Sequence, residues 1–320
     1  MSIINPQSKE LSARLAKFVG RGITPTTYTN LSLMTDSGFM FPEFLKNQGL
    51  QVLVEMHGKM CPSLIREFYS NLQCKNGVYQ TMVKNIFIIL DEDLLVDVGG
   101  LGRFDHPYGY FEEKLLCDFE PVRAYRNMLR DSQRHQATSK PIVNALAVEY
   151  RLLYTSLVYC LAPRDLHHDD PTEVDLYLMF ALKENVRIYW PHLILLNILG
   201  FSTSSSALGY PILISRIIEH ALVDVSDTGY LITDPQENLI LGQYIHFHMD
   251  IYKYEGLWTY FEDVDFYPES PELPPPANNS DEESIAPLVQ YHALDEANND
   301  EAEEDDEEVE EDPSENSDRD

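Results

Sequence analysis

The spacing best suited to metal chemistry in this chain is His246-Phe-His248-Met-Asp250. On a β-strand, residues at i, i+2 and i+4 face the same way, so two imidazoles and a carboxylate could converge on one divalent ion. Such a site would serve a metal-dependent hydrolase or nuclease. Ile251 stands where one hydrolase loop pattern needs a further histidine. We therefore favour the alternative, an exposed strand face with polar side chains.

A second group of candidate ligands is His167-His168-Asp169-Asp170, followed by Pro171. It lies in a polar segment between two apolar ones, and its composition is typical of a turn that begins a helix. We favour this structural interpretation over a metal site.

Other chemistry has no support in the residue spacing. The chain lacks GxSxG, GxxxxGK[ST], GxGxxG and HExxH patterns, and its many scattered aspartates define no particular set, so we assign no catalytic residue and expect no cofactor. The four cysteines, Cys61, Cys74, Cys117 and Cys160, include no CxxC pair. Neither a structural zinc site nor a disulfide framework is indicated, and a reducing compartment fits.

The elements that would position such residues begin with a helix and a hairpin. After Pro62, apolar side chains recur at helical spacing as far as Leu72, which predicts a helix with one buried face. Asn76-Gly77 signals a turn, and the apolar run Ile86 to Leu90 predicts a short hairpin over residues 77–90. A short helix capped by Asp91 is expected to follow and to end near residues 99–100.

Four strongly apolar segments with helical spacing follow at residues 145–161, 172–184, 190–199 and 211–223. Thr172 with Asp175 forms a variant of the capping box, and Trp190-Pro191 opens the third segment. Two enclosed helices flanked by amphipathic ones are typical of the centre of an α-helical domain. Near the end, alternation from Ile245 to Ile251 and a turn at residues 254–257 predict a closing hairpin.

One stretch of the body is basic. Residues 120–134 are predicted to form an exposed helix, because Arg123, Arg126, Arg130 and Arg134 recur at helical spacing. We favour arginines paired with local acids over a phosphate-binding ridge, since the net charge of −30 repels nucleic acid at long range. Direct nucleic-acid binding is therefore not expected.

The charge is concentrated behind Pro268. Residues 269–320 hold 21 Asp or Glu and one basic residue, Arg319, so they carry about −20 of the net −30. This segment starts Pro-rich, and its acidic run from Asp300 to Asp312 repels itself and offers almost nothing apolar to bury, which predicts a disordered acidic tail. The tail suits basic partner proteins or a basic surface of its own chain, although solvating ballast is the interpretation we favour.

These patterns give a mainly α fold of the α+β kind, with a helical core, one or two short β-hairpins and the disordered tail. We expect a weakly ordered segment at 1–40, a mainly helical domain at 41–268 and the tail at 269–320. The start of the chain lacks the pattern of a secretory leader, and its longest apolar run, Leu176 to Leu182, is far shorter than the ~20 residues of a membrane span. A soluble protein of the nucleus or cytoplasm is expected, with no membrane contact.

The helical centre also resembles a known family. The residues that carry the likeness are Arg66 to Leu72, the hairpin with Leu90 to Leu101, Tyr150 to Tyr154 leading to Leu161-Ala162-Pro163-Arg164, Thr172 to Asp175, Tyr189-Trp190-Pro191, and Leu208 to Ile217. Their order is similar to that of the plant transposon protein domain, found within or beside plant mobile-element polyproteins.

The likeness covers residues 62–225 and extends toward Phe261. Gly209 and Pro211 stand in transposed order relative to the Leu-Pro-Tyr-Gly form common in that family, which bears on the loop geometry. The resemblance implies an origin in a transposon or retrotransposon and supplies no catalytic residue. Two hypotheses follow: a non-catalytic module acting through protein contacts, and a metal-dependent hydrolase or nuclease using His246, His248 and Asp250.

Overall fold

The structure, a computed structural model, describes residues 15–103, 119–130, 140–164, 168–242 and 249–263. About 49% of it is helical, and small antiparallel sheets accompany the helices, as expected for a mainly α fold. All described residues belong to one compact unit, Met1–Leu273. The acidic segment 269–320 lies outside the described residues, and the domain boundaries stay a prediction.

Residues 15–19 are helical. The helices that follow, in chain order, are α2 (Leu31–Asp36), α3 (Phe41–Asn47), α4 (Gln51–Val54), α5 (Pro62–Asn71), α6 (Glu92–Gly99), α8 (Pro121–Arg126), α9 (Val148–Ser156), α10 (Glu173–Lys183), α11 (Trp190–Thr203), α12 (Pro211–His220) and α13 (Pro235–Asn238). Shorter helical turns are η1 (Val143–Ala145), η2 (Leu157–Leu161) and η3 (Phe261–Asp263). The described strands are β1 (Lys59–Met60), β2 (Gln73–Lys75), β3 (Val78–Val83), β4 (Ile86–Ile89), β5 (Leu231–Ile232), β6 (Ile251–Tyr254) and β7 (Leu257–Tyr260).

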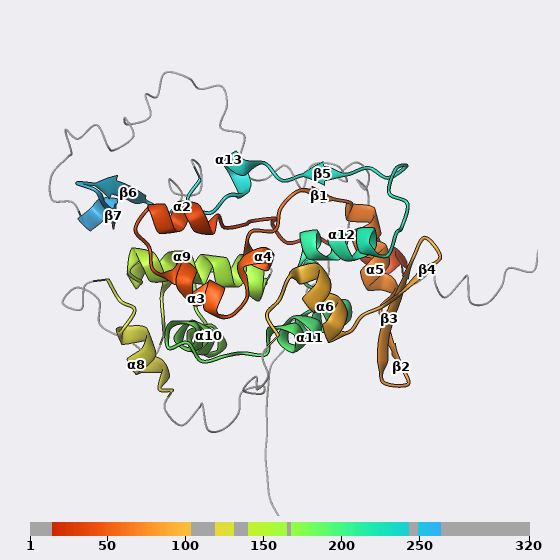
Figure 1. Cartoon of the computed structure of the whole chain (residues 1–320), viewed down its shortest axis with the longest axis horizontal. Helices are drawn as coiled ribbons and strands as arrows, with labels where there is room; N and C mark the ends of the chain where they lie inside the picture. The colour runs from red at the N-terminus through yellow and green to blue at the C-terminus, as the bar shows by residue number, and fades with distance from the viewer. Residues whose placement is uncertain (1–14, 104–118, 131–139, 165–167, 243–248, 264–320) are drawn as a thin grey trace, which may run out of the picture. The chain divides into compact units, whose positions relative to one another are not determined.

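The strands form three small antiparallel sheets, labelled in Figure 1: β1 with β5, β2-β3-β4, and β6 with β7. The β3–β4 hairpin confirms the prediction for residues 77–90, and β2 adds a strand that the sequence did not suggest. The two-residue strands β1 and β5 are far apart in the chain and were also not predicted.

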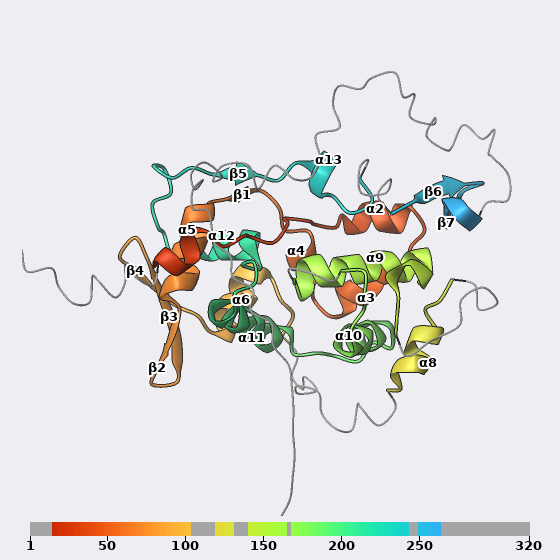
Figure 2. The ribbon, with the colours of Figure 1, turned by 180° about the vertical axis from the view of Figure 1, so that it is seen from behind.

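The apolar segments form the predicted helices. Helix α9 runs directly into the wider turn η2, and α10 packs against both and against α3. Helices α11 and α12 both pack on α5 and α6 (Figures 1 and 2). Trp190, Leu153 and Ile214 are fully or almost fully buried between these helices.

The helix ends show why these segments stop and start where they do. Asp91 caps α6 by accepting a hydrogen bond from Leu94 N at 2.8 Å, and Gly100 ends this helix at a left-handed φ of 61°. Thr172 and Asp175 form the predicted capping box of α10. Both helix limits were therefore predictable from local residue types.

The N-terminal segment differs from the expectation of weak order from residue 15 onward. Leu31 and Met34 of α2 are buried in the core, and Thr29 Oγ1 lies 3.0 Å from Ser156 Oγ of α9. Met40 N and Phe41 N both donate to Glu149 Oε1, at 2.6 and 2.7 Å. These contacts join residues more than 100 positions apart in the sequence, so local sequence patterns could not predict them.

The predicted basic helix over 120–134 is wrong in its extent. Helix α8 ends at Arg126, and residues 131–139, with Arg134, lie outside the described part. The largely buried Arg130 pairs with Glu262 and with Asp263, the latter at 3.4 Å, and its guanidinium lies 4.5 Å from the ring centroid of Tyr260. Arg130 thus attaches the closing hairpin to the body through a cation–π contact with Tyr260 and through ion pairs with Glu262 and Asp263.

The closing hairpin is confirmed in its second half and corrected in its first. Strands β6 and β7 join through a tight turn at Glu255-Gly256, both at positive φ, and β7 packs against α9. The predicted strand over 245–251, however, is interrupted: Met249-Asp250 is a turn, with Asp250 at a φ of 53°, and strand β6 begins only at Ile251. Residues 243–248 lie outside the described part.

Candidate interaction surface

The sheet β2-β3-β4 is built by two tight turns. Asn76-Gly77 joins β2 to β3, and Lys84-Asn85 joins β3 to β4; all four residues have positive φ. Two-residue turns of this kind match the right-handed twist of the strands they connect. The register is therefore fixed, with Met82 opposite Phe87 and Gln80 opposite Ile89.

The two faces of this sheet differ sharply. Thr81, Val83 and Ile88 point to α5 and are buried, and Thr81 Oγ1 donates to Phe68 O at 2.6 Å. On the other face, Phe87 keeps 67% and Ile89 keeps 57% of its surface exposed. Two large apolar side chains thus stand side by side on the outer face of one strand.

Among the described strands, β4 is also an edge of this sheet, and the backbone N–H and C=O groups of Phe87 and Ile89 point away from β3. Leu90 N donates to Tyr79 O at 2.8 Å, so this opposed pair is a hydrogen-bonded one. In an antiparallel ladder hydrogen-bonded pairs alternate with non-bonded pairs, which makes Phe87 and Ile89 members of non-bonded pairs. Their N–H and C=O groups therefore face away from β3, toward the free edge.

The opposite edge of the sheet has another character. Strand β2 is only Gln73–Lys75, and its residues are polar or small, with Lys75 exposed. Short strands and lysine are the usual means by which proteins prevent an edge from pairing with another chain. Strand β4, whose sequence is Ile-Phe-Ile-Ile, contains no charged residue, and no other described strand pairs with its outer side. We define the candidate interaction surface as this open edge with Phe87 and Ile89.

The predicted metal ligands are not brought together by the described structure. His246 and His248 lie outside the described residues, and Asp250 is exposed at the turn before β6, where its backbone O accepts from Phe261 N at 2.9 Å. The extended geometry that would align Asp250 with the two histidines is missing at Asp250 itself. The metal site remains a prediction.

The second candidate group is partly described. His167 lies outside the described part, whereas His168 Nδ1 lies 3.1 Å from Tyr159 Oη and His168 Nε2 lies 2.8 Å from Arg164 O. Asp170 pairs with Lys140 at 3.5 Å. His168 and Asp170 thus contact Tyr159, Arg164 and Lys140. Among the described residues, no three His, Cys, Asp or Glu side chains gather as they would around a metal ion.

A polar cluster that the sequence did not suggest joins α6 to α11. Glu92 Oε1 lies 2.6 Å from His192 Nδ1, and Tyr189 Oη donates to Glu92 Oε2 at 2.5 Å. The hydrogen bond to Glu92, together with burial, raises the pKa of Tyr189 to about 12. A carboxylate that holds an imidazole and a phenol in this way fixes the relative position of the two helices.

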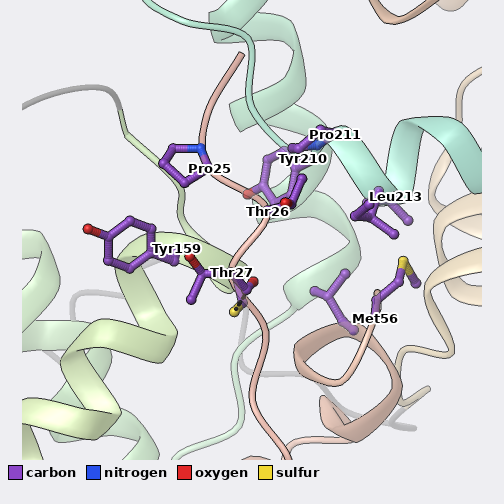
Figure 3. A pocket seen from close by; sticks show the side chains of 11 residues that line it. Pro25, Thr26, Thr27, Met56, Tyr159, Tyr210, Pro211 and Leu213 are labelled. Carbon is purple, nitrogen blue, oxygen red and sulfur yellow. Dashed lines mark hydrogen bonds between the residues drawn. The ribbon is translucent and has the colours of Figure 1, made fainter. Parts of the chain in front are cut away.

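A small cavity lies where the strand-like segment before α2 meets α12 and η2 (Figure 3). Its volume is about 30 Å³, and Pro25, Thr27, Tyr159 and Tyr210 are among its lining residues. One or two water molecules need that much space, whereas a small-molecule site needs roughly 300 Å³ or more. The cavity therefore suits water and not a substrate.

Two reactive groups beside this cavity are tied into the fold. Cys160 Sγ donates to Thr27 O at 3.3 Å, and burial raises the pKa of its thiol to about 12. Tyr210 Oη donates to Leu161 O at 2.7 Å and accepts from Asn197 Nδ2 at 3.0 Å. Burial raises the pKa of Tyr210 as well, so both groups stay neutral at physiological pH.

Sequence reasoning found the strand but not its exposure. The run Ile86 to Leu90 is apolar throughout, and such runs are typical of strands covered on both faces. Only the topology shows that β4 is an edge and that Phe87 and Ile89 face outward.

Comparison of the chain with protein-family models, with curated proteins and with solved structures finds no match. In the part of the chain that the structure describes, no helix is both long enough and apolar enough to traverse a lipid bilayer.

Proposed function

We propose that this chain is a non-catalytic protein-interaction module, encoded by or derived from a plant mobile element, and that the open edge of β4 is its contact surface. The observation that supports this most is the coincidence at Phe87 and Ile89 of exposed apolar side chains with outward-facing backbone groups. Monomeric proteins usually cover or charge such an edge, so an unprotected one marks a site of strand addition.

Several polar side chains of the body support the same proposal, because their described contacts stabilise the fold. Asp175 caps α10 and pairs with Arg164 at 2.9 Å, and Glu92 joins α6 to α11. Gln48 is fully buried and donates through Nε2 to Val186 O at 2.8 Å. These groups hold the scaffold that presents the sheet.

The mobile-element origin is supported by the ordered motifs between residues 62 and 225. The plainest check is the genomic neighbourhood of the open reading frame. Adjacent reverse transcriptase, integrase or terminal-repeat sequence is expected, and an isolated cellular gene without such neighbours would count against this origin.

The contact surface is tested by retention of plant proteins on immobilised chain. Wild type is compared with Phe87→Lys/Ile89→Lys and with Val78→Lys, an exposed apolar residue on the same face but beside β2. Proteins kept by wild type and by Val78→Lys should be lost from the double variant. Equal retention by all three chains would contradict the assignment of this edge.

The metal hypothesis is tested on the same preparations. Metal content and divalent-metal-dependent cleavage of DNA are measured for wild type and for His248→Ala. We expect no stoichiometric metal and no cleavage. Bound metal and cleavage that both disappear in His248→Ala would replace the interaction module with the hydrolase built on His246, His248 and Asp250.

A further inference from the structure

We infer that the partner of the open β4 edge is a second copy of this chain, added strand to strand in antiparallel orientation. The inference rests on the proposed function, since it names the occupant of the same surface. It would join two three-stranded sheets into one continuous sheet across both copies.

The edge itself sets what an occupant must supply. The outward N–H and C=O groups of Phe87 and Ile89 need an extended backbone, which a helix or a small molecule does not offer. The occupant's strand must also be uncharged. A lysine or glutamate placed opposite Ile-Phe-Ile-Ile would lose hydration without gaining an ion-pair partner. The strand β4 of another copy meets both conditions.

The register follows from the direction of the backbone groups. Only outward-facing residues can form hydrogen-bonded pairs across the new junction, and within β4 these are Phe87 and Ile89. A two-fold axis at Ile88 places Phe87 of each copy opposite Ile89 of the other and so uses every outward group of both strands. A pairing of Phe87 with Phe87 would leave Ile89 opposite Asn85, whose φ of 67° is not extended.

This register also matches the side chains. Phe87 of one copy and Ile89 of the other would lie on the same outer face as a directly opposed pair. Aromatic and β-branched side chains opposed in this way stabilise antiparallel sheets. The strand is therefore complementary to itself in hydrogen bonding and in side-chain type.

The contact area places the association in the weak class. Strand pairing over these few residues covers on the order of several hundred Å², below the ~1,200 Å² of a standard stable interface. Two chains of net charge −30 also repel each other. The dimer should thus form at high protein concentration and strengthen as salt screens the repulsion. Binding of the chain to a basic protein would show the opposite salt dependence.

The first experiment is sedimentation equilibrium of the full chain at several concentrations, in low and in moderate salt. Wild type and Val78→Lys should form a dimer whose fraction rises with both concentration and salt, whereas Phe87→Lys/Ile89→Lys should remain monomeric. Circular dichroism and thermal unfolding of each variant confirm that it is folded. A monomer at every concentration, or an unchanged dimer in the folded double variant, would overturn the inference.

A cross-linking experiment tests the register and does not depend on the charge change. Single variants Phe87→Cys and Ile89→Cys are made with Cys74 and Cys117 replaced by serine, and are oxidised separately and as a mixture. Directly opposed residues lie about 5.5 Å apart between Cα atoms, a distance that a disulfide spans. The mixture should cross-link far more than either chain alone. Equal yields in all three samples would contradict the pairing about Ile88.

The two proposals fail in distinguishable ways. A monomeric wild type that still retains plant proteins through Phe87 and Ile89 would refute the second copy and preserve the interaction module, with a foreign strand as its partner. A chain that dimerises through β4 and also cleaves DNA in a His248-dependent manner would refute the non-catalytic module and leave the dimer intact.

Discussion

The helical interior and the open edge of β4 differ in how far their polar groups are hydrogen-bonded and their apolar side chains are buried. In the interior, Tyr210 has a left-handed φ of 52°, and its hydroxyl group is hydrogen-bonded to both Leu161 and Asn197. At Phe87 and Ile89, relaxed strand residues leave large apolar side chains and backbone groups open to solvent. In the interior a strained residue is held by two hydrogen bonds, whereas at the edge no other described strand uses the outward N–H and C=O groups of Phe87 and Ile89.

This difference suggests where function resides. Strain and buried polar groups often mark active sites, but at Tyr210 they are explained by hydrogen bonds that join η2 and α11 to the start of α12. Among the described residues, no contact gives the exposed side chains of Phe87 and Ile89 a comparable structural role. Substitutions that alter one region and leave the other intact separate these two roles.

The largest effect is expected at the ion pair of Asp175 with Arg164, which is 2.9 Å long and mostly buried. Asp175→Ala removes both this pair and the capping box of α10 and leaves the Arg164 charge without its acid. We expect a loss of about 3 kcal/mol in the free energy of unfolding, measured by urea titration. Asp97→Ala is the control, because Asp97 is exposed and 3.9 Å from Arg103; it should change stability by less than about 0.5 kcal/mol. Similar losses in both would refute the assignment.

Proline substitutions separate the two sides of β4. The N–H of Ile88 faces β3 and its side chain is buried, so Ile88→Pro should cost at least about 2 kcal/mol of unfolding free energy. The N–H of Ile89 faces the free edge, a position that tolerates proline, so Ile89→Pro should cost less than about 1 kcal/mol. Urea titrations of both variants check this. A larger loss for Ile89→Pro would show that the deduced hydrogen-bond alternation is wrong.

Glycines provide a similar pair within the helical interior. A Cβ at Gly209 would lie 2.2 Å from the ring of the buried Phe201, whereas Gly200, in the last turn of α11, has open space around it. We expect Gly209→Ala to lower the free energy of unfolding by about 1–3 kcal/mol through overpacking. Gly200→Ala should raise it by about 0.5–1 kcal/mol, since alanine favours helix. Opposite signs in thermal unfolding are the criterion, and a neutral Gly209→Ala would contradict the packing described.

The smallest effect concerns the polar cluster between α6 and α11. Tyr189→Phe removes the hydrogen bond to Glu92 and should cost about 1 kcal/mol at neutral pH. The pKa of Tyr189 is raised from 10.0 to about 12 in the folded chain, so its contribution is complete below pH 10 and is lost as the pH rises toward 12. The stabilities of wild type and variant should therefore converge over that interval. A difference that stays constant with pH would argue against this hydrogen bond.

Much of the helical scaffold was predictable from the sequence because its signals are local. Pro62, the pair Thr172 and Asp175, and Asp91 with Gly100 each mark a helix end by their own chemistry. The arginine spacing after residue 120 gave a wrong prediction of a helix over 120–134, because it too is only a local signal. It is helical in period, but Arg130 is drawn to Glu262, Asp263 and Tyr260, residues far along the chain.

The candidate surface was predictable only in part. The residue types of Ile86 to Leu90 indicate a strand, but which side of β4 stays open depends on β2, β3 and α5 together. The predicted metal set shows the converse case. His246 and His248 lie outside the described residues, and Asp250 departs from the strand that its alternation suggested.

Amide hydrogen exchange of β4, followed by NMR at increasing protein concentration, tests the central claim most directly. In dilute solution the amide of Ile88 should be protected and those of Phe87 and Ile89 should exchange rapidly, because only the first is bonded to β3. As the concentration rises, Phe87 and Ile89 should gain protection together. Protection of all three amides in dilute solution, or continued rapid exchange of Phe87 and Ile89 while the chain associates, would contradict the account.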